Sequence, residues 1–112
     1  MDNYLIYKNN LYEIIELWSS FEKQLEYQNN VPIAQVSHEL FNDWEANFVD
    51  GFEFDKFLTE NEIILFYEFN DTINKISNLT RQILPDISEF IKTKEWKIIN
   101  EKAKEILEKL KS

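Results

Sequence analysis

Apolar residues recur at alternating intervals of three and four along most of this chain, and no other feature restricts its fold as much. This spacing places side chains on one face of an α-helix, which turns about once every 3.6 residues. We therefore predict one continuous helix that ends at Asn29–Asn30, and a second helix that begins near Pro32. The apolar positions are Leu11, Ile14, Trp18, Phe21 and Leu25 in the first helix, and Ile33, Val36, Leu40 and Trp44 in the second.

Two more helices are predicted in the second half, because each has a capping residue ahead of its apolar stripe. Thr59 and Glu62 form the pattern of a capping box, in which each side chain binds the backbone N–H of the other residue. Pro85 ends this third helix, Asp86 is expected to cap a short turn, and Thr93 to cap the last helix. One tryptophan lies within the first stripe and one within the last, so we expect both to be buried. The later stripes are Phe66, Phe69, Ile73, Ile76 and Ile83, and then Trp96, Ile99, Ala103, Ile106 and Leu110.

The stretch 62–69 is ambiguous, since it reads Glu-Ile-Ile-Leu-Phe-Tyr-Glu-Phe and is rich in residues that favour strands. A buried strand there, paired with residues 52–57 as a hairpin, is the alternative. The capping box and the unbroken helical period favour a helix. The predicted fold class is therefore all-α: a four-helix bundle-like single domain over residues 1–112, with an irregular acidic–aromatic segment near 50–58.

Composition excludes several kinds of functional site. The 112 residues include no cysteine, one glycine and one histidine. The chain therefore lacks a disulfide scaffold, a thiolate zinc site and a glycine-rich phosphate loop, and His38 alone does not supply the paired histidines of helical di-iron sites. We expect no cofactor, no metal and no enzymatic activity. The longest apolar run, Ile63–Tyr67, is too short to span a membrane, and the N-terminus does not read as a signal peptide, so a cytoplasmic location is expected.

Negative charge and aromatic rings coincide in the middle of the chain. The net charge is −9, and residues 39–71 hold ten acidic residues against a single base, Lys56. Seven of the nine phenylalanines fall in the same region. Around residues 50–57 acids alternate with rings and no helical period remains, so some rings are expected at the surface beside carboxylates, which is the composition of a binding hot spot. The predicted partner-binding residues are Asp43, Trp44, Asp50, Phe52, Glu53, Phe54, Asp55 and Phe57.

In its small size, its predicted helical fold and its acidic–aromatic middle segment, the chain resembles bacterial toxin-immunity proteins. These are the proteins that protect cells from nuclease colicins and contact-dependent inhibition toxins. The resemblance is one of overall character rather than of a signature motif, so it assigns no role to a single residue. It implies an inhibitor that binds a basic toxin domain, one to one, over the active site or a neighbouring surface.

Two alternatives stay open. The chain could be an acidic nucleic-acid mimic or regulatory adaptor, whose carboxylates imitate phosphates. It could also be a structural homo-oligomeric bundle, in which the first and last apolar stripes pair between chains. Direct binding to nucleic acid is not expected, because neutralising phosphates takes clustered lysine and arginine.

Overall fold

Every regular element in the described part of the chain is a helix, which confirms the all-α prediction for those residues. The alternative prediction of a strand over residues 62–69 is wrong, because these residues lie inside one helix. The computed structural model describes residues 2–48, 56, 58–79 and 84–111, with the backbone alone for 2–5, 78 and 79. The helices are α1 (Asp2–Trp18), α2 (Phe21–Asn30), α3 (Val36–Asn47), α4 (Glu60–Leu79), α5 (Ile87–Phe90) and α6 (Lys94–Lys111).

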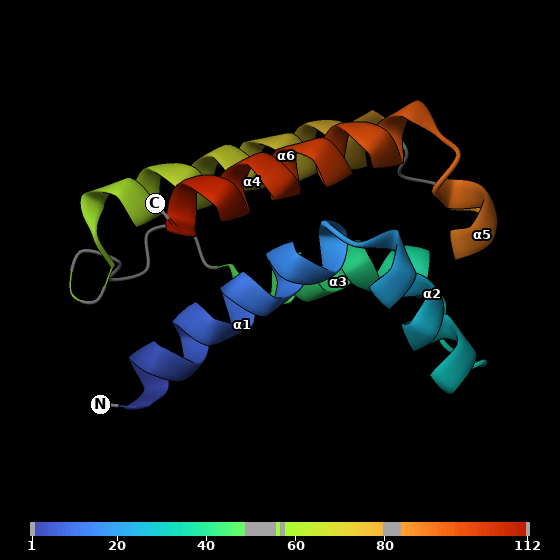
Figure 1. Ribbon diagram of the computed structural model, residues 1–112, viewed down its shortest axis with the longest axis horizontal. Coiled ribbons are helices and arrows are strands. Elements are labelled where there is room, and N and C mark those ends of the chain that lie inside the picture. Colours follow the sequence, from blue (N-terminus) through green and yellow to red (C-terminus); the bar gives the residue numbers. More distant parts are fainter. Residues whose placement is uncertain (1, 49–55, 57, 80–83, 112) are drawn as a thin grey trace.

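The helices form two layers around one core (Figure 1). In one layer α4 and α6 lie side by side and antiparallel, and in the other lie α1, α2 and α3, with the short α5 beside α2. The exposed fractions of Trp18 and Trp96 are 0% and 8%, which confirms that both tryptophans are buried. The largest fully buried side chains are Trp18, Trp44, Phe66, Phe69, Phe90, Leu11, Ile15, Leu40, Ile73, Ile87, Ile99 and Ile106.

The first predicted helix is divided in two at Ser19 and Ser20, which corrects the prediction of one continuous helix. The Ser19 hydroxyl donates a hydrogen bond back to the Glu16 carbonyl at 2.6 Å, and the Ser20 hydroxyl accepts one from the Lys23 N–H at 3.2 Å. Serine side chains compete with the helix for backbone groups, so this pair ends α1 and caps α2. The change of direction leaves Phe21 47% exposed, although its spacing places it on the predicted core stripe.

A buried glutamine holds the corner between α1 and α2. Nε2 of Gln24 donates hydrogen bonds to the carbonyls of Leu17 and Trp18 at 2.9 and 3.2 Å, and its Oε1 accepts one from the Trp96 indole at 2.9 Å. Asn100 of α6 donates another to the Trp18 carbonyl at 2.8 Å. These bonds satisfy carbonyls that the end of α1 leaves without an intrahelical partner, and they tie the corner to α6.

The second predicted helix begins at Val36 rather than near Pro32. The side chain of Gln28 folds over the loop between α2 and α3, where its Nε2 donates to loop carbonyls and its Oε1 accepts from the Val36 N–H at 3.3 Å. The Val31 carbonyl also accepts the Ala34 N–H in a single turn at 2.9 Å, but the carbonyls of Pro32 and Ala34 bind the Gln28 side chain, and no helix begins there. As a result Ile33, predicted to lie in the core stripe, is 94% exposed.

Two of the three predicted caps form as expected. Thr59 Oγ1 accepts from the Glu62 N–H at 3.1 Å, while Glu62 Oε1 accepts from the Thr59 N–H at 2.9 Å, so the capping box is confirmed. Thr93 Oγ1 accepts from an N–H of the first turn of α6 at 3.1 Å. Asp86 precedes α5, but its side chain makes no capping bond, and its backbone carbonyl accepts the first hydrogen bonds of that helix instead.

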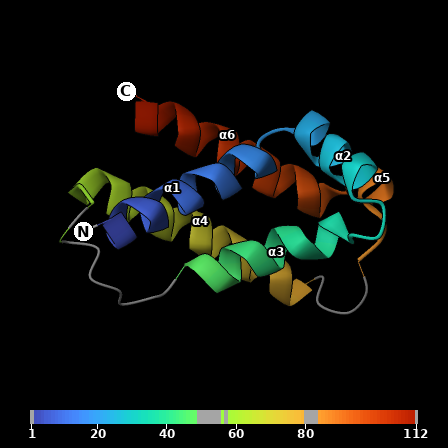
Figure 2. The same ribbon diagram turned by 90° about the horizontal axis from the view of Figure 1, so that it is seen from below.

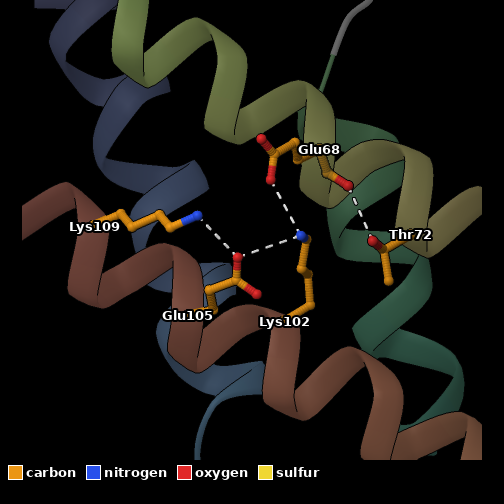
Figure 3. Close-up of polar contacts among 5 residues, drawn as sticks. All are labelled: Glu68, Thr72, Lys102, Glu105 and Lys109. Atoms are coloured by element: carbon orange, nitrogen blue, oxygen red, sulfur yellow. Dashed lines mark hydrogen bonds and ion pairs between the residues drawn. The ribbon is translucent and has the colours of Figure 1, made fainter.

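Charges are neutralised where α4 meets α6 (Figure 3). Lys102 lies 3.1 Å from the Glu68 carboxylate across the two helices and 3.6 Å from Glu105 on its own helix. Lys109 pairs with the same Glu105 carboxylate at 3.0 Å. Acids and bases of this face therefore compensate one another.

Some predictions fall where the structure gives no description. Ile83, the last position of the third stripe, lies outside the described residues. So does the predicted irregular segment near 50–58, apart from Lys56, which is exposed, and Leu58, which is buried in the core.

Candidate functional site

A groove of about 310 Å³ runs between α1 and α3, and we call it the α1/α3 groove. The two helices pack against each other on the face seen in Figure 2. Both walls carry a carboxylate and an amide side chain, and the apolar side chains come from α1. The lining residues are Asn10, Glu13, Ile14, Leu17, Asp43 and Asn47.

Helical spacing brings these side chains together. Asn10, Ile14 and Leu17 recur at intervals of four and three, so they share one face of α1, and Glu13 lies at its margin. On α3 the residues that face them are one turn apart. Ile14 also belongs to the hydrophobic core. The polar lining residues of the groove therefore lie at the boundary between the core and solvent.

Amide side chains fix one end of the groove. Asn10 Nδ2 donates a hydrogen bond to Asn47 Oδ1 at 3.3 Å, which joins α1 to α3. Asn47 Nδ2 donates in turn to the backbone carbonyl of Asp43 at 2.8 Å. The Asn47 amide is thus held through both of its ends, while the Asp43 carboxylate takes no part in these bonds.

The protein disfavours the charge on Asp43. Burial, together with the negative charge of Glu39 one turn earlier on α3, raises the pKa of Asp43 above its usual range. Glu39 accepts a hydrogen bond from the Tyr27 hydroxyl at 2.6 Å. This bond, then burial and the charges of Glu39 and Asp43, raise the pKa of Tyr27 to about 12, so the hydroxyl keeps its proton at neutral pH and goes on donating to Glu39.

No lysine or arginine neutralises the α1/α3 groove within the described part of the chain. Helix α3 contains three acidic residues and neither lysine nor arginine. Glu13 and Asp43 form no ion pair with any described residue. The base of α1, Lys8, is engaged with Glu62 at 2.8 Å. Among the described residues the groove is therefore a negative site without a compensating base, in contrast to the neutralised contact between α4 and α6.

The predicted partner-binding residues have different outcomes. Asp43 lies in the groove, half-buried. Trp44 is a core residue with no exposed surface, which removes it as a direct contact: its Nε1 donates to Asn70 Oδ1 at 3.0 Å, and its ring packs on Phe48 and Phe69. Asp50, Phe52, Glu53, Phe54, Asp55 and Phe57 lie outside the described residues and stay predictions.

Sequence reasoning missed the α1 side of the groove. Glu13 lies outside the apolar stripe, as a solvent-exposed acid would, and its sequence neighbours do not distinguish it from Glu16. Asn10 and Asn47 are separated by 37 residues, and only the packing of α1 on α3 makes them partners. Asn10 directly precedes the first apolar stripe, and Asn47 follows the second. This placement was the sequence feature that could have indicated their contact.

No group of three or more His, Cys, Asp or Glu in the described ranges could hold a metal ion. None of the helices found there is long and apolar enough to cross a membrane.

The chemistry that the groove offers is recognition of cations. Carboxylate oxygens accept hydrogen bonds from guanidinium and ammonium groups, and charge-assisted bonds of this kind are roughly twice as strong as neutral ones. Ile14 and Leu17 add an apolar floor on which the methylene stem of a lysine or arginine can lie.

Comparisons with protein-family models, curated proteins and solved structures find no match to this chain. Its function is therefore inferred from its own geometry and charge.

Proposed function

We propose that this chain is an inhibitor of the immunity type, without enzymatic activity, that binds a basic protein partner through the α1/α3 groove. One observation carries the proposal. Glu13 and Asp43 face a groove that no described lysine or arginine neutralises, while acids elsewhere, such as Glu68 and Glu105, are paired. A partner with a complementary positive surface would supply the missing charge.

The raised pKa of Asp43 also supports the binding of a cationic group in the groove. In the free protein, burial and Glu39 make the ionised carboxylate unfavourable. A cation that enters the groove would offset the repulsion between Asp43 and Glu39. Complementary charge also accelerates association, up to about 10⁸–10⁹ M⁻¹s⁻¹ at low salt.

The sequence extends the proposed surface beyond the groove. Asn47 lines the groove and ends α3, and Asp50 follows three residues later in the chain. The contacts predicted from the sequence between Asp50 and Phe57 lie outside the described residues and are part of the proposed interface. Because Trp44 is in the core, it is no aromatic anchor for the partner, and the anchors that stay predicted are Phe52, Phe54 and Phe57.

The homo-oligomer alternative requires apolar stripes that are free to pair between chains, and the structure offers little such surface on the first and last stripes. Trp18 of the first stripe and Ile99 and Ile106 of the last are buried inside one chain. These stripes therefore cover each other in the monomer and leave little apolar area for pairing between chains.

The test is growth protection. The neighbouring genes would first be searched for a protein that ends in a toxic domain, as the proposal requires. The chain would then be co-expressed with that domain, and the binding affinity measured by calorimetry at low and high salt. We expect protection and an affinity that falls with salt. The groove variant, Glu13→Lys with Asp43→Lys, should lose both.

The matched control is the α6 control variant, Glu101→Lys with Glu108→Lys, which changes net charge by the same amount on two exposed positions. It should still protect. Equal loss in both variants would show that only total charge matters, and a neutral effect of the groove variant would remove the groove from the interface.

A further inference from the structure

A second depression, which we call the α2/α5 pocket, lies at the far end of α3. It has a volume of about 470 Å³ and is bounded by the C-terminal half of α2, the loop that follows it and the start of α5. Leu25, Ile33 and Ile87 provide its apolar surface. Neither lysine nor arginine is among the described residues that line it.

The loop that carries Ile33 is held in place before any partner arrives. Gln28 Nε2 contacts the carbonyls of Val31 and Pro32 at 3.3 and 3.4 Å and that of Ala34, and its Oε1 accepts from the Val36 N–H. A single side chain thus binds both ends of the loop. An isoleucine that is 94% exposed is therefore presented by a loop with little freedom left to lose on binding.

A free carboxylate stands at the rim of this pocket. Asp86 is exposed, makes no capping bond to α5, and forms no ion pair with any described residue. Its neighbour Glu89, in contrast, is paired with Lys92 at 3.1 Å. Asn29 and Gln35, also at the rim, add amide oxygens that can accept hydrogen bonds.

We propose that the α2/α5 pocket receives an arginine side chain of the basic partner; the inference rests on the proposed function for the identity of that partner. The methylene stem lies along Leu25 and Ile33, and the guanidinium reaches Asp86. Arginine fits better than lysine, because its planar head carries five donors for the several rim acceptors and is less strongly hydrated than an ammonium.

The test is a titration of the full chain, labelled with ¹⁵N, with N-acetyl-arginine amide at millimolar concentrations. Saturable shifts are expected at the backbone amides of Ile33, Gln35 and Ser88. N-acetyl-citrulline amide, which has the same shape without the charge, should produce no saturable shift. The lysine analogue should bind more weakly.

Variants then locate the charge and the apolar contact. Asp86→Asn should weaken arginine binding about two- to fivefold, the range for an exposed ion pair. Glu89→Gln removes one charge nearby without touching the pocket and should leave affinity unchanged. Ile33→Ser should also weaken binding without affecting folding, since this side chain packs on nothing that the fold needs.

The outcomes separate this proposal from the proposed function. Shifts confined to Asn10 and Asn47 would overturn the pocket and leave the α1/α3 groove intact. An equal response to citrulline, or equal effects of Asp86→Asn and Glu89→Gln, would overturn it as well. If arginine binds the pocket while the groove variant still protects cells, the pocket stands and the groove falls.

Discussion

Asp43 lies half-buried between α1 and α3, with Glu39 one helical turn before it. No described lysine or arginine pairs with it, and its own helix carries neither. Functional groups are often held in environments that disfavour them, because interactions that a partner supplies are then worth more. At the scale of single residues, we therefore expect that replacing the Asp43 carboxylate raises the stability of the free protein and weakens partner binding.

The first prediction is that Asp43→Asn raises the stability of the free protein slightly and weakens partner binding. Removing a like-charge pair one turn apart on a helix stabilises by about 0.3 kcal/mol. The pKa of Asp43 is raised in the folded state, so its stabilising contribution is complete below the unfolded pKa of about 3.9 and is lost as pH rises through the folded value. The gain in the variant should therefore be present at neutral pH and disappear in acid, as measured by urea unfolding.

Glu45 is the control for this prediction. It is an exposed acid on the same helix, outside the groove. Glu45→Gln should change neither stability nor binding by a measurable amount. A loss of stability in Asp43→Asn would mean that the carboxylate is structural.

Gln24 is the second residue with a single testable role. Gln24→Leu keeps the volume of the side chain but leaves the buried Trp96 indole N–H without its partner. It also removes one of two hydrogen bonds to the Leu17 carbonyl, which still accepts one from the Ser20 N–H. Each buried polar group that loses its partner costs about 1–3 kcal/mol. We expect a loss in that range or above it by chemical unfolding, whereas Gln35→Leu, the same change at an exposed position, should cost little.

At the scale of helices, the start of α4 is also the point where α4 is fastened to α1. Glu62 caps α4 through Thr59, accepts a hydrogen bond from the Tyr12 hydroxyl at 3.0 Å, and pairs with Lys8 at 2.8 Å. Burial alone would raise the pKa of Glu62, but the bonds from Lys8, Thr59 and Tyr12 outweigh it and lower the pKa. One carboxylate therefore serves two helices.

The third prediction concerns acid. Because the folded pKa of Glu62 is lowered, its contribution is present above the unfolded value of about 4.3 and is lost as pH falls through the folded value. Glu62→Gln should cost about 1–3 kcal/mol at neutral pH, and the difference from the natural chain should shrink in acid. Urea midpoints across the acid range measure this, with the exposed Glu60→Gln as a control. A constant difference at every pH would exclude the ionic role.

Periodicity predicted most of the helical core but not the breaks in it. Trp18, Phe66 and Ile99 are buried as their spacing requires, since spacing depends only on the local helix. Phe21 and Ile33 lie on the same stripes and are exposed, because Ser20 and Gln28 redirect the backbone through side-chain hydrogen bonds that no hydrophobic pattern reveals.

The candidate site was only half predictable for a related reason. Asp43 could be found from the charge along the chain, but Glu13 and Asn10 join it only because α1 packs on α3, a long-range contact. Trp44 was predicted both as a position of the second apolar stripe and as a partner-binding residue. Its position on the α3 stripe, which the same spacing rule recognises, decides its burial.

At the scale of the whole molecule, charge is divided between faces. Seven of the twelve basic residues fall within residues 92–112, which include all of α6. There they pair with acids such as Glu105 (Figure 3). The α1/α3 groove has no such partners within the described ranges. A positively charged molecule that approaches this protein therefore meets a directional field rather than a uniform one.

The fourth prediction tests the partner contacts predicted from the sequence at Glu53 and Asp55, which lie outside the described residues. Glu53→Lys with Asp55→Lys should slow association with the basic toxin domain and reduce its salt dependence, while dissociation changes less. The α6 control variant shifts net charge equally and should keep most of the association rate. Stopped-flow mixing at several salt concentrations distinguishes the two. Identical rates in both variants would show that the field is not directional.

The corner between α1 and α2 also has a consequence for biosynthesis. Gln24 binds Trp96, a residue 72 positions later, and Trp18 binds Asn100, 82 positions later. A ribosome adds the residues from Gln24 to Trp96 in about 4–14 s. During that interval the first two helices exist without the side chains that complete their junction. The N-terminal helices therefore cannot complete the core during synthesis. We expect the native state to form only after the last helix has been synthesised.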